Sequence, residues 1–144
     1  MSVKLTEDQK RIAEQIAPGK PYIVNKPWGR EEWLALNEEY CYKRLYINAG
    51  QKTSLQYHNQ KYETNYVISG EAEIWLGDSA EAIEKWKVGA GFFFNVAPPK
   101  IHRVCALTDL VLQEVSTPQV DDVVRINDDW NRSDGKIQSE HSAK

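Results

Sequence analysis

An amide, an imidazole and a carboxylate lie close together in the sequence, between two glycines that mark turns. Gln56 and His58 are two residues apart, so an extended strand would place both side chains on one face. Glu63 follows after a short turn, which would bring its carboxylate next to the other two groups. His102 lies downstream and is a fourth candidate, in a chain that has only three histidines. These residue types at this spacing predict a metal site.

Such a ligand set favours one divalent metal ion bound by nitrogen and oxygen atoms. Two imidazoles, a carboxylate and an amide oxygen suit Zn²⁺ best, and Mn²⁺, Co²⁺, Ni²⁺ or Fe²⁺ are also possible. A position would remain open for water or a substrate, where the ion would act as a Lewis acid. A single histidine in a strand is usually structural, but four candidates at ligand spacing favour metal binding.

The length and composition of the chain are those of an ordinary single-domain globular protein. It has 144 residues, of which 41% are hydrophobic and 27% charged, and no apolar run is long enough to span a membrane. The net charge of −3 gives no general attraction to nucleic acid or to an anionic membrane. The N-terminus lacks the apolar core of a signal peptide, and Cys41 and Cys105 have no paired spacing. We therefore expect free thiols and a cytoplasmic location.

The candidate ligands must be positioned by a β-rich region that follows a short helix. Thr6 and Gln9 fit a capping box, which predicts a helix over residues 6–17 within an N-terminal extension of residues 1–20. Short β-branched and aromatic runs then predict strands at 31–36, 40–48, 53–58, 63–69, 71–76, 91–96, 101–106 and 109–116. Many short strands at this spacing are typical of an antiparallel sandwich or barrel, here over residues 21–132.

Two segments are too polar to fit this pattern. The segment 79–87 carries several charged side chains, so we expect a solvated connection between strands. Residues 133–144 have almost no apolar anchors, which predicts a disordered tail.

The segment around Gln56 and His58 resembles the first motif of the cupin superfamily, G(x)5HxH(x)3-4E(x)6G, with Gln56 in place of the first histidine. The second motif, G(x)5PxG(x)2H(x)3N, is matched at Gly91 and His102. Its three remaining positions differ and are occupied by Ala97, Pro99 and Ala106. The resemblance implies an all-β cupin jelly-roll barrel, or double-stranded β-helix, with the metal inside and a short N-terminal α-helix outside.

Four separated segments carry a narrower resemblance, to the isomerase domain of type II mannose-6-phosphate isomerases. They are Lys26-Pro-Trp-Gly29, Ser54–His58, His102-Arg103 and Asp121–Arg132, within residues 22–132. This resemblance implies that the metal ligands are Gln56, His58, Glu63 and His102, and a glutamine ligand is itself a mark of phosphomannose isomerases among cupins. It also implies interconversion of mannose 6-phosphate and fructose 6-phosphate by proton transfer through an enediolate.

If both histidines bind the metal, the proton must be carried by a lysine, an acidic residue or a bound water. Lys61 shares strand parity with Glu63, which would direct it into the same cavity, and Glu114 lies on a late strand that could face inward. By resemblance, Lys61 occupies the place of a lysine two residues before the ligand glutamate of the family. Arg125 similarly matches an arginine at the active site of type I phosphomannose isomerases, and we expect it to contact the substrate or the enediolate.

Binding of a sugar phosphate would require cations for the phosphate and polar groups for the sugar. Guanidinium and ammonium groups suit a phosphate dianion, and the candidates are Arg44, Lys52 and Arg132. Ser54 and Lys52 share the strand parity of the predicted ligands, and Asp121 belongs to the stretch that matches the type I enzymes. The expected partner is therefore a small-molecule sugar phosphate.

Structural roles are alternatives for several of these residues. Most lysines are solvated, so Lys52 and Lys61 could equally lie on the surface. Arg103 should face away from the metal ligands in a regular strand, which equally fits a structural ion pair. Asp128 and Asp129 could form a metal pair, although a capped turn or a solvated loop is favoured.

Other functions are also compatible with the sequence. The altered second motif permits a non-catalytic or regulatory cupin that binds a sugar or a sugar nucleotide. A cupin dioxygenase is a third possibility, although Gln56 departs from the two-histidine, one-carboxylate set of many iron oxygenases. Closure of a barrel leaves few free strand edges, and a remaining edge or the aromatic surface could form a homodimer contact.

Overall fold

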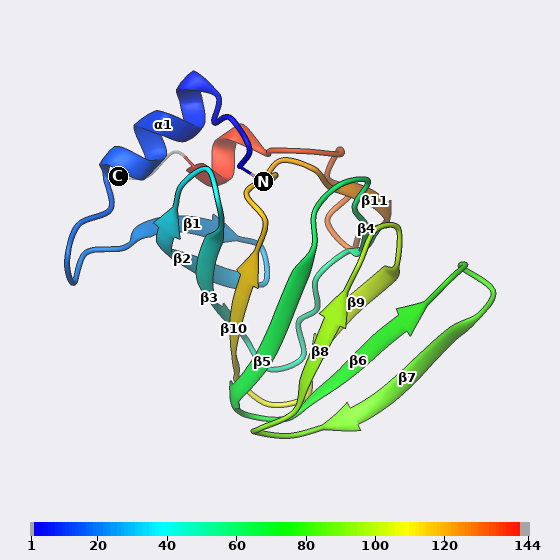
Figure 1. Cartoon of the computed structure of the whole chain (residues 1–144). Helices are drawn as coiled ribbons and strands as arrows, with labels where there is room; N and C mark the ends of the chain where they lie inside the picture. The colour runs from blue at the N-terminus through cyan, green and yellow to red at the C-terminus, as the bar shows by residue number, and fades with distance from the viewer. Residues whose placement is uncertain (1, 142–144) are drawn as a thin grey trace.

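The computed structural model describes residues 2–141, which form two antiparallel β-sheets, one α-helix and a short 3-10 helix. The elements are α1 (Glu7–Glu14), β1 (Tyr22–Lys26), β2 (Gly29–Leu36), β3 (Cys41–Ile47), β4 (Leu55–Tyr57), β5 (Glu63–Ser69), β6 (Ala72–Gly77), β7 (Ile83–Val88), β8 (Phe93–Val96), β9 (Ile101–Ala106), β10 (Leu110–Ser116), β11 (Val124–Asn127) and η1 (Gln138–His141). The strand orders are β1-β2-β3-β10-β5-β8 and β11-β4-β9-β6-β7, and the two sheets enclose a barrel (Figure 1). The jelly-roll fold expected from the sequence is confirmed.

The core lies between the two sheets because side chains alternate along each strand. In β3 every second residue is buried, which directs Lys43 and Ile47 inward. Leu112 of β10 and Ile74 of β6 meet Ile47 in one hydrophobic cluster. Lys43 and, in β5, Glu63 are charged residues at buried positions. They mark the part of the barrel where the apolar core gives way to a polar pocket.

The N-terminal helix begins with the capping box that the sequence predicts. The Thr6 hydroxyl accepts a hydrogen bond from the Gln9 backbone N–H, and the Gln9 side chain accepts one from the Thr6 backbone N–H, both at 3.1 Å. The helix ends at Glu14, three residues before the predicted end. Ile12 packs into a second hydrophobic cluster with residues of β1 and β2, including Val24 and Trp33, so α1 covers the outside of the barrel (Figure 1).

Three strands were not anticipated from the sequence. The expected solvated connection at 79–87 is wrong, because β7 pairs with β6 along its whole length. Its residues are nearly all exposed, so the hydrophobic alternation that identifies a half-buried strand is missing. The β6–β7 hairpin extends away from the rest of the barrel (Figure 1). The other two, β1 and β11, are short strands that pair with β2 and β4.

The expected disorder from residue 133 onward does not match the structure up to residue 141. These residues, which we call the C-terminal strap (residues 133–141), pass over the barrel and end in η1. Glu140 is buried, and its carboxylate forms ion pairs with Lys26 and Arg132. Buried charge pairs therefore anchor the strap, whose only apolar side chain is that of Ile137. The rest of the predicted tail, 142–144, lies outside the described residues.

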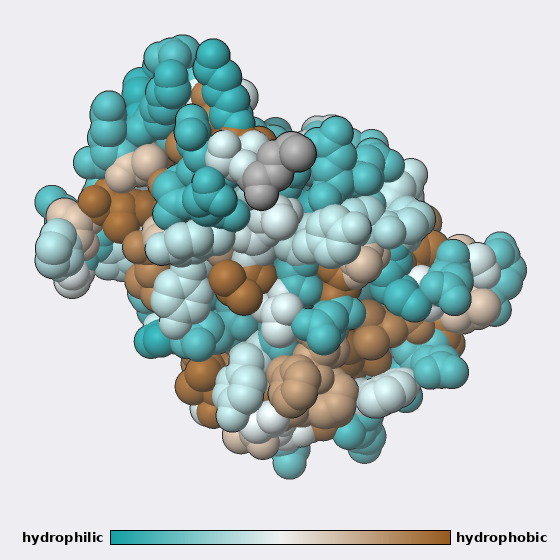
Figure 2. Space-filling view, viewed as in Figure 1, coloured by the Kyte–Doolittle hydropathy of each residue, from teal (hydrophilic) through white to brown (hydrophobic). Residues whose placement is uncertain are grey.

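The surface is mixed in character. Exposed aromatic and aliphatic side chains include Tyr66 and Ile68 of β5, Phe93 of β8 and Trp86 of β7. On the face seen in Figure 2, the hydrophobic patches are interrupted by hydrophilic side chains. The homodimer stays a prediction. Within residues 2–141, α1 is too short and polar for a membrane-spanning helix, and η1 is shorter still.

Candidate metal centre

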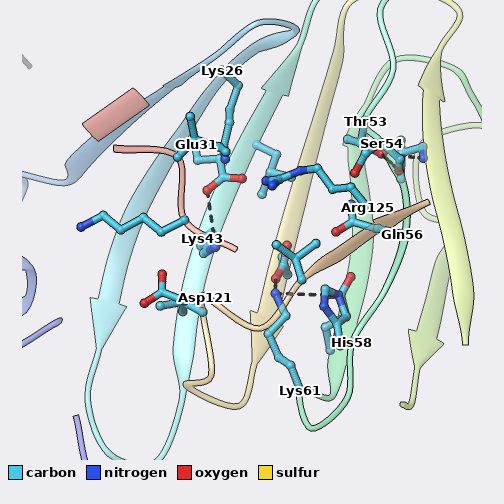
Figure 3. A pocket seen from close by; sticks show the side chains of 18 of the residues that line it. Lys26, Glu31, Lys43, Thr53, Ser54, Gln56, His58, Lys61, Asp121 and Arg125 are labelled. Atoms are coloured by element: carbon cyan, nitrogen blue, oxygen red, sulfur yellow. Dashed lines mark hydrogen bonds and ion pairs between the residues drawn. The ribbon is translucent and has the colours of Figure 1, made fainter. Parts of the chain in front are cut away.

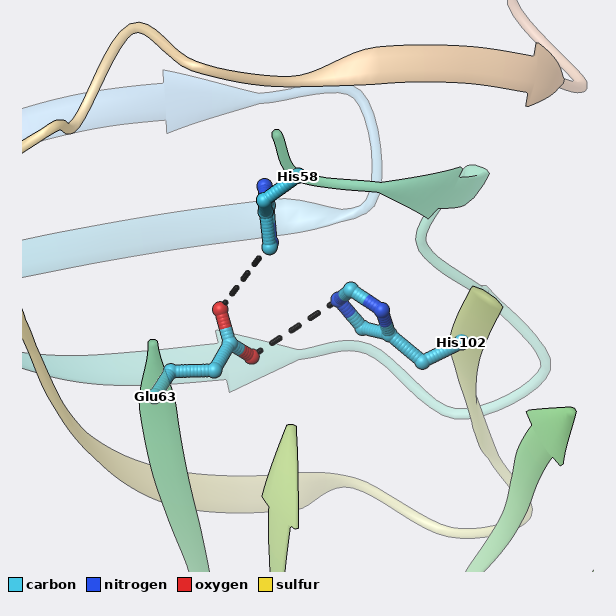
Figure 4. A group of neighbouring side chains, drawn as sticks. All are labelled: His58, Glu63 and His102. Carbon is cyan, nitrogen blue, oxygen red and sulfur yellow. Dashed lines mark hydrogen bonds and ion pairs between the residues drawn. The ribbon is translucent and has the colours of Figure 1, made fainter. Parts of the chain in front are cut away.

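Three of the predicted ligands meet inside the barrel. His58 follows β4, Glu63 begins β5 and His102 lies in β9, and all three side chains are buried. Nε2 of His58 is 3.1 Å from Oε1 of Glu63, and Nε2 of His102 is 3.7 Å from Oε2 of the same carboxylate. Figure 4 shows one carboxylate oxygen facing each imidazole. The three ligand atoms lie within 4.8 Å of one another, which is close enough to share one metal ion.

Backbone carbonyl groups orient both imidazoles. Nδ1 of His58 lies 2.6 Å from the carbonyl oxygen of Asp122, and Nδ1 of His102 lies 3.0 Å from that of Lys100. Because a carbonyl oxygen can only accept, each Nδ1 must donate, and a neutral ring then presents the lone pair of Nε2 toward Glu63. Lone pairs from two imidazoles and a carboxylate converge on one point, which is the arrangement that a cation stabilises. The donor set therefore fits a divalent metal ion.

Burial and charge favour the metal-binding protonation states. Burial lowers the pKa of His102, which keeps the ring in the neutral form that ligates metals. Burial also opposes ionisation of Glu63, but the ammonium group of Lys61 holds its pKa well below the usual range. The carboxylate is thus ionised.

Gln56 lies in β4, in the same sheet as His102, whereas Glu63 lies in the other sheet. It pairs with His102 in the register of β4 and β9, and with Arg125 in the register of β4 and β11. Its side chain lines the same pocket as His58 and Glu63. Its amide oxygen as the fourth ligand stays a prediction.

Lys61 and Glu114 form a buried ion pair next to this centre. Nζ of Lys61 lies 3.2 Å from Oε2 of Glu114 and 3.4 Å from Oε1 of Glu63. Lys61 is 6% exposed, so the surface alternative for this lysine is wrong. Burial disfavours the charged lysine, but the two carboxylates outweigh it and raise the pKa of Lys61 above the usual range. The pair is therefore an ammonium and a carboxylate, both directed into the barrel.

A second buried ion pair, missed by the sequence analysis, lies beside the first, because Lys43 of β3 is paired with Glu114 in the register of β3 and β10. Nζ of Lys43 lies 3.4 Å from Oε1 of Glu31, and the Trp33 indole N–H donates a 2.8 Å hydrogen bond to that oxygen. Burial opposes ionisation of Glu31, but Lys43, Lys26 and the Trp33 hydrogen bond lower its pKa to about 2. In Figure 3 the side chains of this pair and of Lys26 lie on one side of the pocket, opposite Gln56 and His58. A charged residue at an alternating inward position of a strand is the signal that could have identified Lys43.

Four of the remaining predicted site residues lie in the pocket, and two lie outside it. Ser54, Asp121, Arg125 and Arg132 line the pocket. Arg125 donates hydrogen bonds to the carbonyl oxygens of Ser133 and Gly135, and Arg132 binds Asp128 and Glu140.

The structure places Arg44 and Lys52 outside the pocket, contrary to prediction. Arg44 lies between inward positions of β3, so its side chain points outward and donates to Gln113 at 3.1 Å. Lys52 precedes β4, where the strand parity used to place it does not apply, and its Nζ lies 3.7 Å from a carboxylate oxygen of Asp129.

Two structural alternatives are supported by the contacts. Arg103 donates to the backbone carbonyl of Thr53 at 2.8 Å, which fits a structural role. Asp128 accepts hydrogen bonds from the backbone and side chain of Arg132, which fits a capped turn.

Comparison with solved structures shows the same fold. The capsular polysaccharide assembling protein CapF from Staphylococcus aureus aligns with a TM-score of 0.63 at 15% identity, over 73% of this chain and 34% of that chain. An RmlC-like cupin from Shewanella frigidimarina aligns with a TM-score of 0.60 at 18% identity, over 71% and 87% of the two chains. KdgF from Halomonas sp. aligns with a TM-score of 0.58 at 21% identity, over 67% and 84%. The barrel thus has the same fold as these proteins.

Sequence comparison gives a narrower relationship. Mannose-1-phosphate guanylyltransferase 2 of Escherichia coli O157:H7 is 27% identical over 117 residues, which cover 77% of this chain and 23% of that protein. The xanthan biosynthesis protein XanB of Xanthomonas campestris pv. campestris (strain B100) is 26% identical over 113 residues, which cover 76% and 24%. The chain spans about a quarter of the length of these curated relatives. The family model described as Mannose-6-phosphate isomerase C-terminal matches residues 18–128, most of the barrel, and the chain therefore belongs to this family of cupins.

Proposed function

We propose that the protein is a metal-dependent aldose–ketose isomerase that interconverts mannose 6-phosphate and fructose 6-phosphate. The observation that carries the proposal is the buried Lys61–Glu114 ion pair, which lies against Glu63 of the candidate metal centre. Ligand atoms, a proton acceptor and a cation are thus within one cavity inside a cupin barrel. Membership of the mannose-6-phosphate isomerase C-terminal family supports the substrate class.

His58, Glu63, His102 and Gln56 would hold the metal ion. When bound, a divalent cation supplies Lewis acidity toward the carbonyl or hydroxyl oxygens of the sugar. The backbone carbonyl groups that bind the two Nδ1 atoms keep the imidazoles oriented toward Glu63. This orientation does not depend on the substrate, so the site is preorganised.

Glu114 is our candidate for the group that moves the proton. The reaction removes the hydrogen at C2 of the aldose as a proton, forms an enediolate and returns a proton to C1, while the hydroxyl hydrogen of O2 is transferred to O1. No oxidant or reductant is consumed. An ammonium group has no lone pair, so the carboxylate of the Lys61–Glu114 pair is the member that can accept the proton. Lys61 would stabilise the negative charge that develops on oxygen.

The polar groups around this centre would bind the rest of the substrate. Arg125 and Ser54 line the cavity and suit the oxygen atoms of the sugar, and Arg132 suits the phosphate. Asp121 also lines the cavity, and its carboxylate accepts a 3.2 Å hydrogen bond from Gln9 of α1. It would thus face the sugar from the side covered by the helix.

The test combines metal analysis with an activity assay. Purified protein should contain one metal ion per chain and form fructose 6-phosphate from mannose 6-phosphate, as measured by a coupled assay. It should also exchange the C2 hydrogen of the substrate with solvent deuterium, because the proton passes through a carboxyl group. His58→Ala should lose both metal and turnover. Metal-loaded protein that neither forms product nor exchanges the C2 hydrogen would contradict the proposal.

A second candidate function is binding of a sugar or a sugar nucleotide without catalysis. The altered second cupin motif favours it, because Ala97, Pro99 and Ala106 stand at three of its positions. Thermal stabilisation by the sugar without turnover would support this alternative, because a ligand that binds only the native state raises the melting temperature.

A further inference from the structure

The C-terminal strap covers the mouth of the pocket through contacts to its cations. Arg125 donates hydrogen bonds to the carbonyl oxygens of Ser133 and Gly135, and its backbone N–H donates to the side chain of Asp134 at 2.7 Å. On the other side, Lys136 of the strap forms an ion pair with Asp8 of α1. Gly135, Lys136, Ile137 and His141 all line the pocket. The strap thus forms part of the pocket wall.

The carboxylate of Glu140 lies between two cations at this mouth. Oε1 is 2.8 Å from Nζ of Lys26, and Oε2 is 3.1 Å from Nη1 of Arg132. The three side chains are 8–13% exposed, so the cluster is shielded from solvent. Arg132 is also held by Asp128, which accepts from its Nε and Nη2 at 2.9 Å. Asp128 therefore fixes the guanidinium and leaves Nη1 directed at Glu140.

Lys26 and Arg132 belong to the same cavity as the candidate metal centre. Both line the pocket that contains His58, Glu63 and His102. They approach the mouth from separate segments, the end of β1 and the loop after β11. Two cations held in place and directed at a buried anion form a site that suits other anions with several oxygen atoms, phosphate above all.

The volume of the cavity indicates that the strap must be displaced before a substrate can bind. The pocket encloses about 100 Å³, whereas pockets for small organic ligands are usually about 300–1,000 Å³. The strap is held by ion pairs and hydrogen bonds and carries little apolar surface, so its displacement would expose little hydrophobic area. Release of Glu140 would free both Lys26 and Arg132 and enlarge the space beside them.

We propose that Lys26 and Arg132 form the binding site for the phosphate group of the substrate, and that Glu140 occupies this site when the substrate is absent. The identification of the ligand as a sugar phosphate rests on the proposed function. A phosphate monoester carries more charge and more oxygen atoms than a carboxylate, so it can replace Glu140 on the two cations. The strap and the substrate therefore compete for one site, and the strap is an internal inhibitor of phosphate binding.

Glu140→Gln in the full chain tests the competition directly, with inorganic phosphate as the probe. The variant keeps the shape of the side chain but removes the charge that competes with phosphate. We expect phosphate to bind at least about tenfold more tightly than to the wild type, as measured by titration calorimetry at constant ionic strength. The variant should also have a lower melting temperature, because two cations lose their anion, and phosphate should raise it more than an equivalent concentration of chloride does.

Two further variants locate the effect. Glu32→Gln removes a carboxylate that pairs with Arg30 outside the pocket, and it should bind phosphate like the wild type. Lys26→Gln combined with Glu140→Gln should lose the gain in affinity. Mannose 6-phosphate should then compete with phosphate for the Glu140→Gln protein, whereas mannose should not.

A measurement on the wild type covers the case in which Glu140→Gln fails to fold. Mannose 6-phosphate should increase amide hydrogen exchange in residues 133–141, because the strap leaves the pocket. Unchanged exchange in a protein that binds mannose 6-phosphate would overturn the proposal, as would equal phosphate affinity of folded Glu140→Gln and wild type. Neither measurement depends on turnover, so phosphate binding without isomerase activity would refute the proposed function alone.

Discussion

The backbone carbonyl of Asp122 accepts a 2.6 Å hydrogen bond from Nδ1 of His58, while the side chain of Asp122 binds the loop that follows this histidine. Its carboxylate accepts from the backbone N–H groups of Asn59, Gln60 and Lys61, at 2.6–3.1 Å. Partial burial acts against ionisation, but these three N–H groups keep the pKa of Asp122 below its ordinary value of 3.8. One residue far along the chain thus fixes both the first imidazole and the turn that leads to Glu63.

Asp122→Ala should therefore weaken metal binding without removing a ligand. Loss of an outer partner of a metal-ligating residue typically lowers affinity by about 10- to 100-fold, and we expect a decrease in that range. Competition between metal-depleted protein and a chromophoric zinc chelator measures the affinity. The control is Asp109→Ala, which removes a carboxylate that accepts from the Ala49 N–H in a loop elsewhere. Equal zinc affinity of Asp122→Ala and wild type would show that the loop holds its shape without the carboxylate.

The three histidines offer an internal comparison for the metal site. His58→Ala and His102→Ala should each reduce the bound metal to a small fraction of the wild-type amount, because each removes one of the converging nitrogen ligands. His141→Ala should retain the metal, because His141 lies in the C-terminal strap and contacts Tyr22 and Trp33. Metal content by mass spectrometry after dialysis checks this. Stoichiometric metal in His58→Ala or His102→Ala would exclude that residue as an essential ligand.

Glu114→Gln should separate proton transfer from metal binding. The amide keeps the shape of the side chain but cannot accept a proton, so kcat should fall by about 10²- to 10⁴-fold. Metal content should not change, because Glu114 contacts Lys61 and is not a predicted ligand. Glu73→Gln is the matched control, because that carboxylate binds the Trp75 indole and does not line the pocket. An active Glu114→Gln protein would assign the proton transfer to another group.

Lys61→Met should lower the free energy of unfolding as well as the activity. It leaves the buried carboxylates of Glu63 and Glu114 without the cation between them, and removal of one partner of a buried pair typically costs about 3–5 kcal/mol. Urea unfolding of the metal-free proteins measures the loss. Lys100→Met is the control, because it breaks an ion pair with Asp78 whose lysine is 37% exposed and should cost less than about 1 kcal/mol. Similar losses in the two variants would contradict a charged, buried Lys61.

The sequence alone was sufficient for the barrel and for the grouping of His58, Glu63 and His102 inside it. Strand parity correctly placed Lys61 beside Glu63, because β5 begins at Glu63 and the preceding loop keeps the lysine turned inward. The same parity failed for Lys52, because β4 is regular only from Leu55. Parity is reliable inside a strand, whereas beyond its end the conformation of the loop decides where each side chain points.

Contacts between distant segments were the part that the sequence could not provide. The pairing of Glu140 with Lys26 joins the two ends of the fold, and nothing in a polar tail indicates that its charges have buried partners. β7 escaped detection for a related reason, since it pairs with β6 but is exposed on both faces. In both cases the stabilising interaction is made with a remote residue or a neighbouring backbone, and hydrophobic periodicity does not report it.

Glu31 should make the unfolding free energy of the protein depend on pH in the acidic range. Its pKa is lowered from 4.5 to about 2 by the folded structure, so its contribution is present above pH 4.5 and is lost as the pH falls toward 2. A shift of this size corresponds to about 3 kcal/mol. Between pH 4.5 and 2 the unfolding free energy of the wild type should therefore fall by about 3 kcal/mol more than that of Glu31→Gln, whose amide does not titrate. Urea unfolding at a series of pH values measures the difference, and the exposed-pair control Glu32→Gln should follow the wild type. Parallel pH profiles for Glu31→Gln and wild type would show that the Glu31 carboxyl titrates alike in the folded and unfolded chains.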